Sequence, residues 1–269
     1  LPLNPMKTAG YFIIIVSLVS CMQNSEPYQR PAVIAHRGAS GIAPENTLAA
    51  VQKALDAGAD MVEIDVHFSK DNKVIVMHDA SVIRTTGVMG DIDQMTLEEI
   101  KALDAGTWFS TDYAGEPVPT LEEVLALTIG KNILLIEIKK GRAGRYEGLE
   151  QAVIDIVDAH QARENVIIQS FEYETVQQVQ RLAPGVEVHQ LVAVAGGLDK
   201  YEGIAAINPY YRTLTRRFIR EAHEKGLKVF PYTVNSEKEM KKCIRSRVDG
   251  IITNFPDRLI KVLKEIEAS

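Results

Sequence analysis

Residues 33–68 read VIAHRGASGIAPENTLAAVQKALDAGADMVEIDVHF, and this stretch decides the fold because two strand-like segments flank one helical segment. Apolar residues recur at the spacing of one helix face in LAAVQKALDA, with Asn46 in place to cap the helix and Gly58 in place to end it. Residues 33–35 and 61–66 have strand character. A strand, a helix and a second strand in this order predict two parallel strands joined by a crossover helix.

Short apolar segments alternate with helical segments along the rest of the chain. Continuous apolar strands separated by helices indicate a parallel sheet that is covered on both faces. About eight such units predict an α/β fold, a TIM (β/α)8 barrel with a small insertion after the second strand, and a doubly wound open sheet is the alternative. The expected strands are residues 33–35, 61–66 with 74–77, 133–138, 166–168, 186–192, 204–207, 228–230 and 250–252.

The segment from about residue 79 to residue 119 is far longer than the about 2 to 6 residues of an ordinary strand–helix loop. It carries TTG, GTWFS and GEPVP, and the sequence TLEE at 96–99 and again at 120–123 predicts a capped helix start at each place. We expect an insertion that narrows the entrance of the barrel. Trp108 and Phe109 are expected either to pack within it or to form an apolar wall of the site.

Residues 1–21 have the pattern of a bacterial lipoprotein signal peptide. A lysine precedes an apolar run at 11–19, which is shorter than the about 20 residues of a membrane span, and the run leads to LVSC with Cys21. We predict a signal peptide with an upstream extension at 1–5, a lipidated Cys21 that anchors the protein to a membrane of the cell envelope after export, and a tether at 22–30. An ordinary cleaved signal or a short buried helix are the alternatives.

The remaining chain has the composition of one globular domain, which we place at residues 31–269. The whole chain is 46% hydrophobic and 25% charged. Its formal net charge of −6 gives no overall basic field, so nucleic acid is not an expected partner, and no protein partner is predicted. If Cys21 is lipidated, Cys243 is left alone and no intrachain disulfide is expected. An anionic ligand must be held by local cations, of which Arg37 is the first candidate.

Three acidic residues lie in segments expected to be buried strands. Alternation places Glu63 and Asp65 on one face of MVEIDVHF, and it places Glu137 on the same face as Lys139 in ILLIEIKK. Three buried carboxylates repel one another unless a cation lies among them, and oxygen ligands favour Mg²⁺ or Ca²⁺ over zinc. The alternative is that these acids are surface charges or ion-paired groups of the core.

Two histidines end apolar segments, so they should emerge at the carboxyl ends of strands, where barrel enzymes have their active sites. His36 is followed by Arg37, and His78 ends KVIVMH. Beside the three acids and Lys139, they predict an acid–base pair that acts on an anionic substrate at a metal ion. We assign no role to the other four histidines, of which the last two lie in helical stretches and are expected at the surface: His67, His189, His160 and His223.

These residues lie in a series of motifs that resembles the glycerophosphodiester phosphodiesterases: HRGASGIAPENT, EIDVHFSKDNKVIVMHD, TTG, PTLEEVL, IEIK, YTVN and VDGIITNFPD, in this order. The resemblance implies a TIM barrel with an insertion after the second strand, and hydrolysis of glycerophosphodiesters to glycerol 3-phosphate and an alcohol. It also implies roles for the site residues. His36 and His78 would be the general acid–base pair, the metal ligands would be Glu63, Asp65 and Glu137, and the phosphate contacts would be Arg37 and Lys139.

The same resemblance implies that the neighbouring glycerol hydroxyl attacks the phosphate, giving a cyclic phosphate that water then opens while the histidines exchange roles. Which histidine acts first as the base stays open. Two positions depart from the family pattern, because Tyr232 stands where tryptophan is common and Asn254 where aspartate is usual. We expect both to contact the substrate. The glycines after Arg37 are expected to let the backbone approach the phosphate, and Glu45 either orients Arg37 or favours the helix start.

Two rival functions stay open. A related barrel enzyme would cleave intact phospholipids, and a catalytically inactive lipoprotein would only bind phosphodiesters. The presence of every expected catalytic residue argues against the inactive protein. The polar site and the long insertion favour a small glycerophosphodiester over a lipid with two acyl chains.

Overall fold

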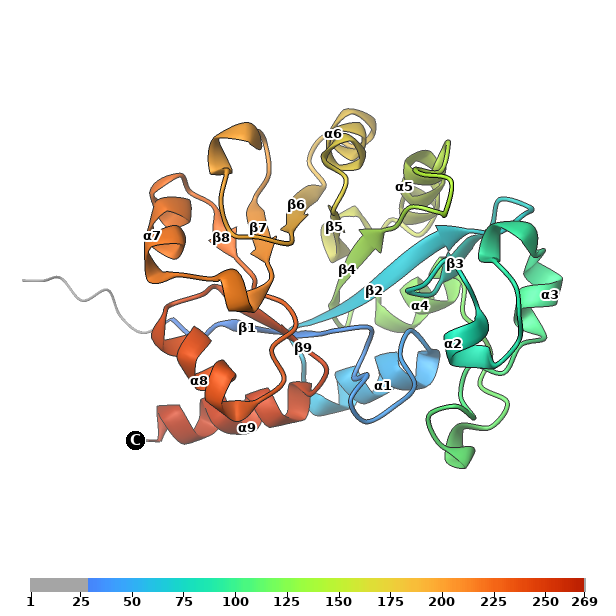
Figure 1. Cartoon of the computed structure of the whole chain (residues 1–269), viewed down its shortest axis with the longest axis horizontal. Helices are drawn as coiled ribbons and strands as arrows, with labels where there is room; N and C mark the ends of the chain where they lie inside the picture. The colour runs from blue at the N-terminus through green and yellow to red at the C-terminus, as the bar shows by residue number, and fades with distance from the viewer. Residues whose placement is uncertain (1–28, 269) are drawn as a thin grey trace, which may run out of the picture.

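Eight parallel strands form a barrel at the centre of the computed structural model, which describes residues 29–268 (Figure 1). The strands are β1 (Ala32–Ala35), β2 (Met61–Phe68), β4 (Ile133–Ile138), β5 (Val166–Ser170), β6 (Glu187–Val192), β7 (Ala206–Pro209), β8 (Lys228–Val229) and β9 (Gly250–Thr253). Their hydrogen-bonded order is β8-β7-β6-β5-β4-β2-β1-β9. The two ends of this order are joined by backbone hydrogen bonds from Asp249 N–H to Val229 O at 3.1 Å and from Ile252 N–H to Pro231 O at 3.0 Å. The predicted barrel is confirmed, and the open-sheet alternative is wrong.

Helices follow most of the strands and cover the outside of the barrel (Figure 1). They are α1 (Leu48–Ala57), α4 (Leu121–Thr128), α5 (Leu149–Ala159), α6 (Tyr173–Leu182), α7 (Arg216–Glu224), α8 (Glu237–Arg245) and α9 (Pro256–Glu267). Between β6 and β7 the chain forms only a 3₁₀ turn, η4 (Leu198–Lys200), in place of an α-helix. Within residues 29–268, no helix is long and apolar enough to cross a membrane. The predicted signal peptide, Cys21 and most of the tether lie outside the described residues.

The start of α1 differs by one residue from the prediction. Thr47 is the N-cap, because its Oγ1 accepts a hydrogen bond from the Ala50 N–H at 3.2 Å. Asn46, the predicted cap, has a φ of 56° and turns its side chain toward Asp65 instead. Gly58 ends the helix with a φ of 79°, as predicted. The amide of Asn46 is therefore available to the site.

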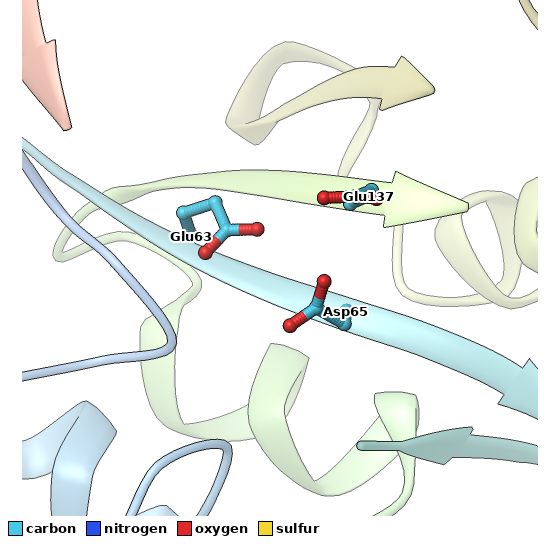
Figure 2. Close-up of side chains that lie close together, drawn as sticks. All are labelled: Glu63, Asp65 and Glu137. Carbon is cyan, nitrogen blue, oxygen red and sulfur yellow. The ribbon is translucent and has the colours of Figure 1, made fainter. Parts of the chain in front are cut away.

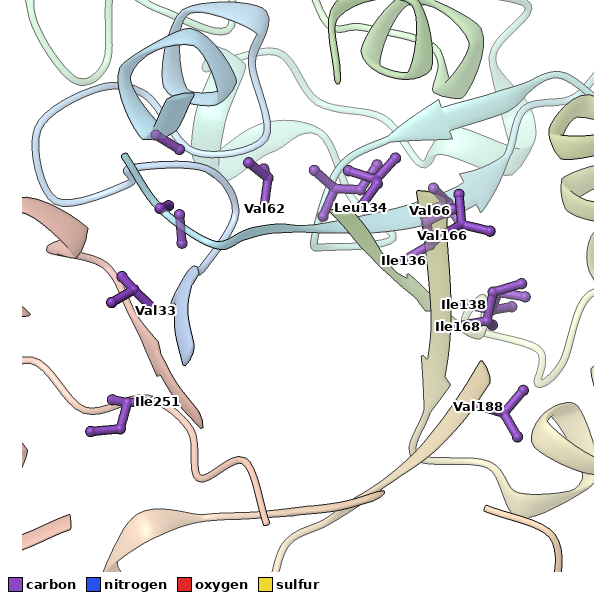
Figure 3. Packing of buried hydrophobic residues seen from close by; sticks show 14 of the residues in the cluster. Val33, Val62, Val66, Leu134, Ile136, Ile138, Val166, Ile168, Val188 and Ile251 are labelled. Carbon is purple, nitrogen blue, oxygen red and sulfur yellow. The ribbon is translucent and has the colours of Figure 1, made fainter. Parts of the chain in front are cut away.

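The apolar side chains of the strands form two layers. Those that point outward, such as Val62 and Val66 of β2, pack between the ring of strands and the helices (Figure 3). Each such fully buried side chain contributes about 1.5–3 kcal/mol to folding. Those that point inward fill the interior nearer the amino ends of the strands, and they are Ile34, Leu135, Ile167, Ala206, Phe230 and Ile252. Polar residues line the interior near the carboxyl ends of the strands.

The insertion at 79–119 follows a hairpin in which β3 (Val74–Val76) pairs antiparallel with β2. It contains α2 (Ile83–Thr86), η1 (Ile92–Gln94), α3 (Leu97–Lys101) and η2 (Thr111–Tyr113), and it lies beside the barrel at the right of Figure 1. The capping boxes at Thr96 and Thr120 both form, as predicted. The insertion has a small core of its own, which includes Val82, Ile92, Ile100, Leu103 and Val118.

The aromatic residues of the insertion pack on one another. The Trp108 indole N–H donates to Ala105 O at 2.8 Å. Its ring meets Phe109 edge to face with centroids 5.8 Å apart, and Phe109 meets Tyr113 at 5.9 Å. The Tyr113 hydroxyl donates to Ile42 O in the loop after β1 at 3.2 Å. Of the two arrangements expected for Trp108 and Phe109, the structure therefore has the one in which they pack within the insertion.

Candidate active site

Three carboxylates converge inside the barrel at the carboxyl end of two neighbouring strands. Glu63 and Asp65 come from β2 and Glu137 comes from β4, with Asp65 and Glu137 side by side in the register (Figure 2). All three side chains are buried, and an oxygen of each lies within 4.8 Å of an oxygen of the others. The alternative that they are surface charges is wrong. A cluster of oxygen ligands of this kind can hold a hard divalent cation.

The electrostatics of the cluster favour such a cation. Burial raises the pKa of Glu63 well above its ordinary value, and the charges of Asp65 and Glu137 raise it further. Burial also raises the pKa of Glu137 to about 7, although Lys139 opposes this. Burial disfavours the ionised form of Asp65 too, but Lys139 and Arg37 outweigh it and hold the pKa of Asp65 below its ordinary value. A divalent cation would allow all three carboxyl groups to ionise together.

One buried oxygen of the cluster lacks a hydrogen-bond donor. The Asn46 Nδ2 donates to Asp65 Oδ2 at 2.8 Å, and the Asp65 N–H donates back to Asn46 Oδ1 at 3.2 Å. Asp65 Oδ1 accepts no hydrogen bond among the described residues, although Lys139 Nζ lies 3.3 Å away. Buried polar atoms are normally satisfied, so this oxygen is available to a ligand. The donor set therefore fits a divalent cation.

His36 directly follows β1 and is fixed to β9 by a hydrogen bond from its N–H to Thr253 O at 2.9 Å. Its Nδ1 lies 2.7 Å from Asn254 Oδ1. Because an amide oxygen only accepts, Nδ1 carries the proton and Nε2 keeps its lone pair. Burial lowers the pKa of His36 to about 4, and the nearby charge of Arg37 lowers it further. His36 is therefore neutral at neutral pH, with a basic nitrogen to offer.

His78 comes two residues after β3, at the point where the insertion begins. Its Nδ1 donates to Asp79 Oδ1 at 2.6 Å, and its backbone oxygen accepts from His67 Nε2 at 3.1 Å. Burial lowers the pKa of His78, and Lys139 and Arg37 lower it as well, while Asp65 and, to a smaller extent, Asp79 raise it. Like His36, this histidine has Nδ1 engaged by an acceptor, which leaves Nε2 as its reactive nitrogen.

Arg37 takes up a left-handed backbone conformation with a φ of 55° directly after His36. Its N–H donates to Glu63 Oε2 at 2.8 Å, and its Nη1 donates to Glu45 Oε1 at 2.9 Å. Its Nε lies 3.5 Å from Asp65 Oδ2 and is buried, and it makes no hydrogen bond to any residue that the structure describes. The predicted contact between Glu45 and Arg37 is therefore present, and Arg37 retains a free donor for an anion.

Lys139, the other predicted phosphate contact, lies against the carboxylates. Its Nζ donates to Glu137 Oε1 at 2.7 Å and lies 3.3 Å from Asp65 Oδ1. Burial would lower the pKa of Lys139, but these two acids outweigh it and raise the pKa above its ordinary value. Lys139 is thus a cation held at the edge of the acidic cluster.

The glycines of the bend have a packing role. A Cβ on Gly38 would lie 2.6 Å from the Ala50 backbone, and a Cβ on Gly41 would lie 2.3 Å from the Phe255 ring. Gly38 also has a φ of 73°. These contacts show why glycine stands at both positions, whereas the predicted approach of the backbone to a phosphate stays a prediction.

Three further histidines have polar partners in the structure. His67 is buried on the interior face of β2 and supports the His78 carbonyl, and His189 is buried and bonded to Glu187 at 2.8 Å. His223 is exposed, as predicted, and its Nε2 lies 2.8 Å from Asp249 Oδ2. The partners of His67 and His223 come from other parts of the chain, whereas Glu187 lies two residues before His189 on β6.

Tyr232 lies after β8 in a group of aromatic rings. Its ring centroid is 5.9 Å from that of Phe171 and 6.1 Å from that of Tyr210, which follow β5 and β7. Its hydroxyl donates to Val192 O at 3.2 Å. Burial raises the pKa of Tyr232 to about 12, so the hydroxyl stays neutral. This group forms an apolar side of the barrel mouth, opposite in character to the acidic cluster.

One end of this β/α barrel carries a carboxylate cluster that can hold a metal ion, two histidines that can present Nε2, and two basic side chains. This combination is typical of one class of protein, the barrel hydrolases of phosphate esters. The comparison with known families gives the particular member of that class. The model of the glycerophosphoryl diester phosphodiesterase family matches residues 36–258. The chain belongs to this family, and it is a phosphodiester hydrolase.

Relatives and solved structures agree with this assignment. The chain is 38% identical over 242 residues to the glycerophosphodiester phosphodiesterase of Caldanaerobacter subterraneus, covering 87% of this chain and 98% of that protein. It is 37% identical over 258 residues to the glycerophosphodiester phosphodiesterase of Bacillus subtilis, covering 87% of each chain. A phosphodiesterase of Oleispira antarctica, solved with its product sn-glycerol-3-phosphate, superimposes with a TM-score of 0.82 at 30% identity, covering 87% of this chain and 97% of that one.

Proposed function

We propose that this protein hydrolyses small glycerophosphodiesters to glycerol 3-phosphate and an alcohol, and that the reaction depends on a divalent cation, Mg²⁺ or Ca²⁺. Family membership supports the reaction type. The Oleispira relative, which binds sn-glycerol-3-phosphate as product, supports the choice of product. The observation that carries the proposal is the pairing of a carboxylate cluster with two histidines whose Nδ1 atoms are both occupied.

Each group in the site has a proposed task. Glu63, Asp65 and Glu137 would hold the cation, which when bound would stabilise negative charge on the phosphate oxygens. Arg37 and Lys139 contact the phosphate and spread its charge further.

The two histidines move the protons. One of His36 and His78 accepts the proton of the attacking glycerol hydroxyl at Nε2, and the other donates a proton to the leaving alcohol oxygen. Attack gives a cyclic phosphate ester, and water then opens it with the two roles exchanged. His36 is neutral at neutral pH, so it can accept a proton at Nε2, and it can donate one there only after it has accepted it. The acid in each half of the reaction is therefore the histidine that carries the proton at that point.

Release of glycerol 3-phosphate from glycerophosphocholine tests the proposal, with product measured by a coupled dehydrogenase. His36→Ala and His78→Ala should each lower kcat by about a hundredfold or more, the usual contribution of a general acid or base. His160→Ala is the matched control and should keep full activity, because the His160 ring bonds to the Ile156 carbonyl at the end of α5, which lies outside the barrel.

The rival functions give different results in the same assay. Binding of glycerophosphocholine without turnover by the metal-loaded protein would indicate an inactive binding protein. Faster turnover of diacyl phospholipid in mixed micelles would indicate a lipase. Either result would contradict the proposal.

We also propose that the protein is exported and held at a membrane of the cell envelope through a lipidated Cys21. The sequence pattern at residues 11–21 supports this. The described chain begins at Gln29 and enters β1 at its amino end, whereas the candidate site lies at the carboxyl ends of the strands. A tether attached there would leave the mouth of the barrel open to substrate.

A further inference from the structure

Arg84, from the short helix α2 of the insertion, bridges two acids that belong to different loops at the mouth of the barrel. Its Nε donates to Asp79 Oδ2 at 2.6 Å. Its Nη1 and Nη2 donate to the two oxygens of Glu45 at 2.8 and 2.7 Å. The guanidinium group therefore contacts both acids: Nε binds Asp79, and the two Nη atoms form a bidentate contact with Glu45.

Each of these acids also accepts a hydrogen bond from a residue that we assign to the reaction. Asp79 Oδ1 accepts from His78 Nδ1 at 2.6 Å. Glu45 Oε1 accepts from Arg37 Nη1 at 2.9 Å. A continuous chain of hydrogen bonds thus runs from the proposed acid–base histidine, through Arg84, to the proposed phosphate contact.

The two acids need such a brace because neither is held tightly by its own segment. The side chain of Asp79 is 35% exposed, and a lone carboxylate beside a histidine can rotate away or be drawn to water. Glu45 is mostly buried and faces Arg37, so one arginine alone would leave its second oxygen without a donor. Arg84 supplies a donor to the second oxygen of each acid.

We propose that Arg84 is a positioning residue for the reaction, which fixes Asp79 and Glu45 so that His78 and Arg37 meet the phosphodiester in one geometry. This inference rests on the proposed function. It gives the insertion a task in the reaction, because the insertion carries the residue that links His78 to Arg37.

The proposal makes a specific claim about proton affinity at His78. Several charged or titratable groups face this histidine from the elements around it: Arg37 and His36 after β1, Asp65 and His67 on β2, Lys139 after β4, and Asp79 beside it. Asp79 favours the protonated form of His78 through its hydrogen bond to the ring. Removing Arg84 lets Asp79 turn away and should therefore lower the proton affinity of His78, and removing the charge of Asp79 should lower it as well.

The test compares Arg84→Met, Arg84→Lys and Asp79→Asn in the metal-loaded protein. Arg84→Met should lower kcat by about 10- to 100-fold, the cost of a small misplacement of reacting groups, with a smaller change in KM. Arg84→Lys should recover part of the loss because it keeps the charge but not the two-pronged contact. The control is Arg163→Met, because Arg163 makes the same kind of two-pronged contact with Asp158 far from the site.

A second readout does not depend on turnover. NMR titration of the His78 ring should give a lower pKa than in the wild type both in Arg84→Met, where Asp79 is no longer held, and in Asp79→Asn, where its charge is removed. Unchanged kcat, together with an unchanged His78 titration in folded Arg84→Met, would overturn the proposal. If Arg84→Met does not fold, the same two measurements on Arg84→Lys and Asp79→Asn decide. Absence of turnover by the wild type would instead count against the proposed function, and the titration would still report on Arg84.

Discussion

Replacing Asn254 with aspartate should raise the pKa of His36 and shift the pH dependence of turnover. Asn254 Oδ1 accepts the hydrogen bond of His36 Nδ1 at 2.7 Å, and it carries no net charge. The pKa of His36 is about 4 because burial and Arg37 both disfavour its charged form. In Asn254→Asp a carboxylate takes the same place, and it stabilises the imidazolium form.

The size of the effect follows from the short distance. Two opposite unit charges about 4 Å apart attract by about 4 kcal/mol at the effective dielectric constant of about 20 that suits such sites. That corresponds to about a thousandfold in proton affinity, and the cost of burying the new carboxylate reduces it toward about tenfold. The limb of the pH–rate profile that reports His36 should therefore move to higher pH by about one unit, which corresponds to the tenfold increase in proton affinity.

The assay is the pH dependence of kcat for glycerophosphocholine hydrolysis by Asn254→Asp and by the wild type. Asn165→Asp adds the same charge near the amino end of β5, away from the site, and it should leave the profile unchanged. Two profiles that coincide, in a variant with normal folding, would refute the assigned contact between His36 and Asn254 as a determinant of catalysis.

Three further predictions concern the cation, the substrate and the anchor. Because burial raises the pKa of Glu137 to about 7, its carboxyl is protonated below that pH in the metal-free protein. Metal affinity should therefore rise as the pH increases through about 7, with release of a proton, which calorimetry in buffers of different ionisation enthalpy would detect; pH-independent affinity would contradict this. Glycerophosphocholine and glycerophosphoethanolamine should be cleaved with a far higher kcat/KM than diacyl phospholipids, and matched kinetics that reverse this order would exclude the small-substrate site. Cys21→Ala should move the protein from the membrane fraction to the soluble fraction, and mass spectrometry that finds Cys21 unmodified in the mature protein would contradict the anchor.

The barrel and the acidic cluster were predictable from the sequence because both depend on local periodicity. Alternation along β2 and β4 placed Glu63, Asp65 and Glu137 on the interior face, and the structure has all three there. Histidines at the ends of apolar segments were found in the same way. The order of the strands and the closure of the barrel then bring these residues together at one end.

The residues that support the site could not be read from such patterns. Arg84 meets Glu45 across 39 positions of sequence, and His67 reaches the His78 carbonyl only because β2 and β3 form a hairpin. Asn46 and Thr47 are both good helix caps, and the choice between them depends on the hydrogen bonds that Asp65 offers to Asn46. Contacts of this kind are set by tertiary packing, which local sequence does not specify.

The most direct test of the account is the release of glycerol 3-phosphate from glycerophosphocholine by one protein sample before and after its metal is removed. The cluster of Glu63, Asp65 and Glu137 predicts that the metal-free protein is inactive and that Mg²⁺ or Ca²⁺ restores turnover. Full activity in excess chelator, in a sample shown by elemental analysis to contain no metal, would contradict the central claim that this barrel is a cation-dependent glycerophosphodiester hydrolase.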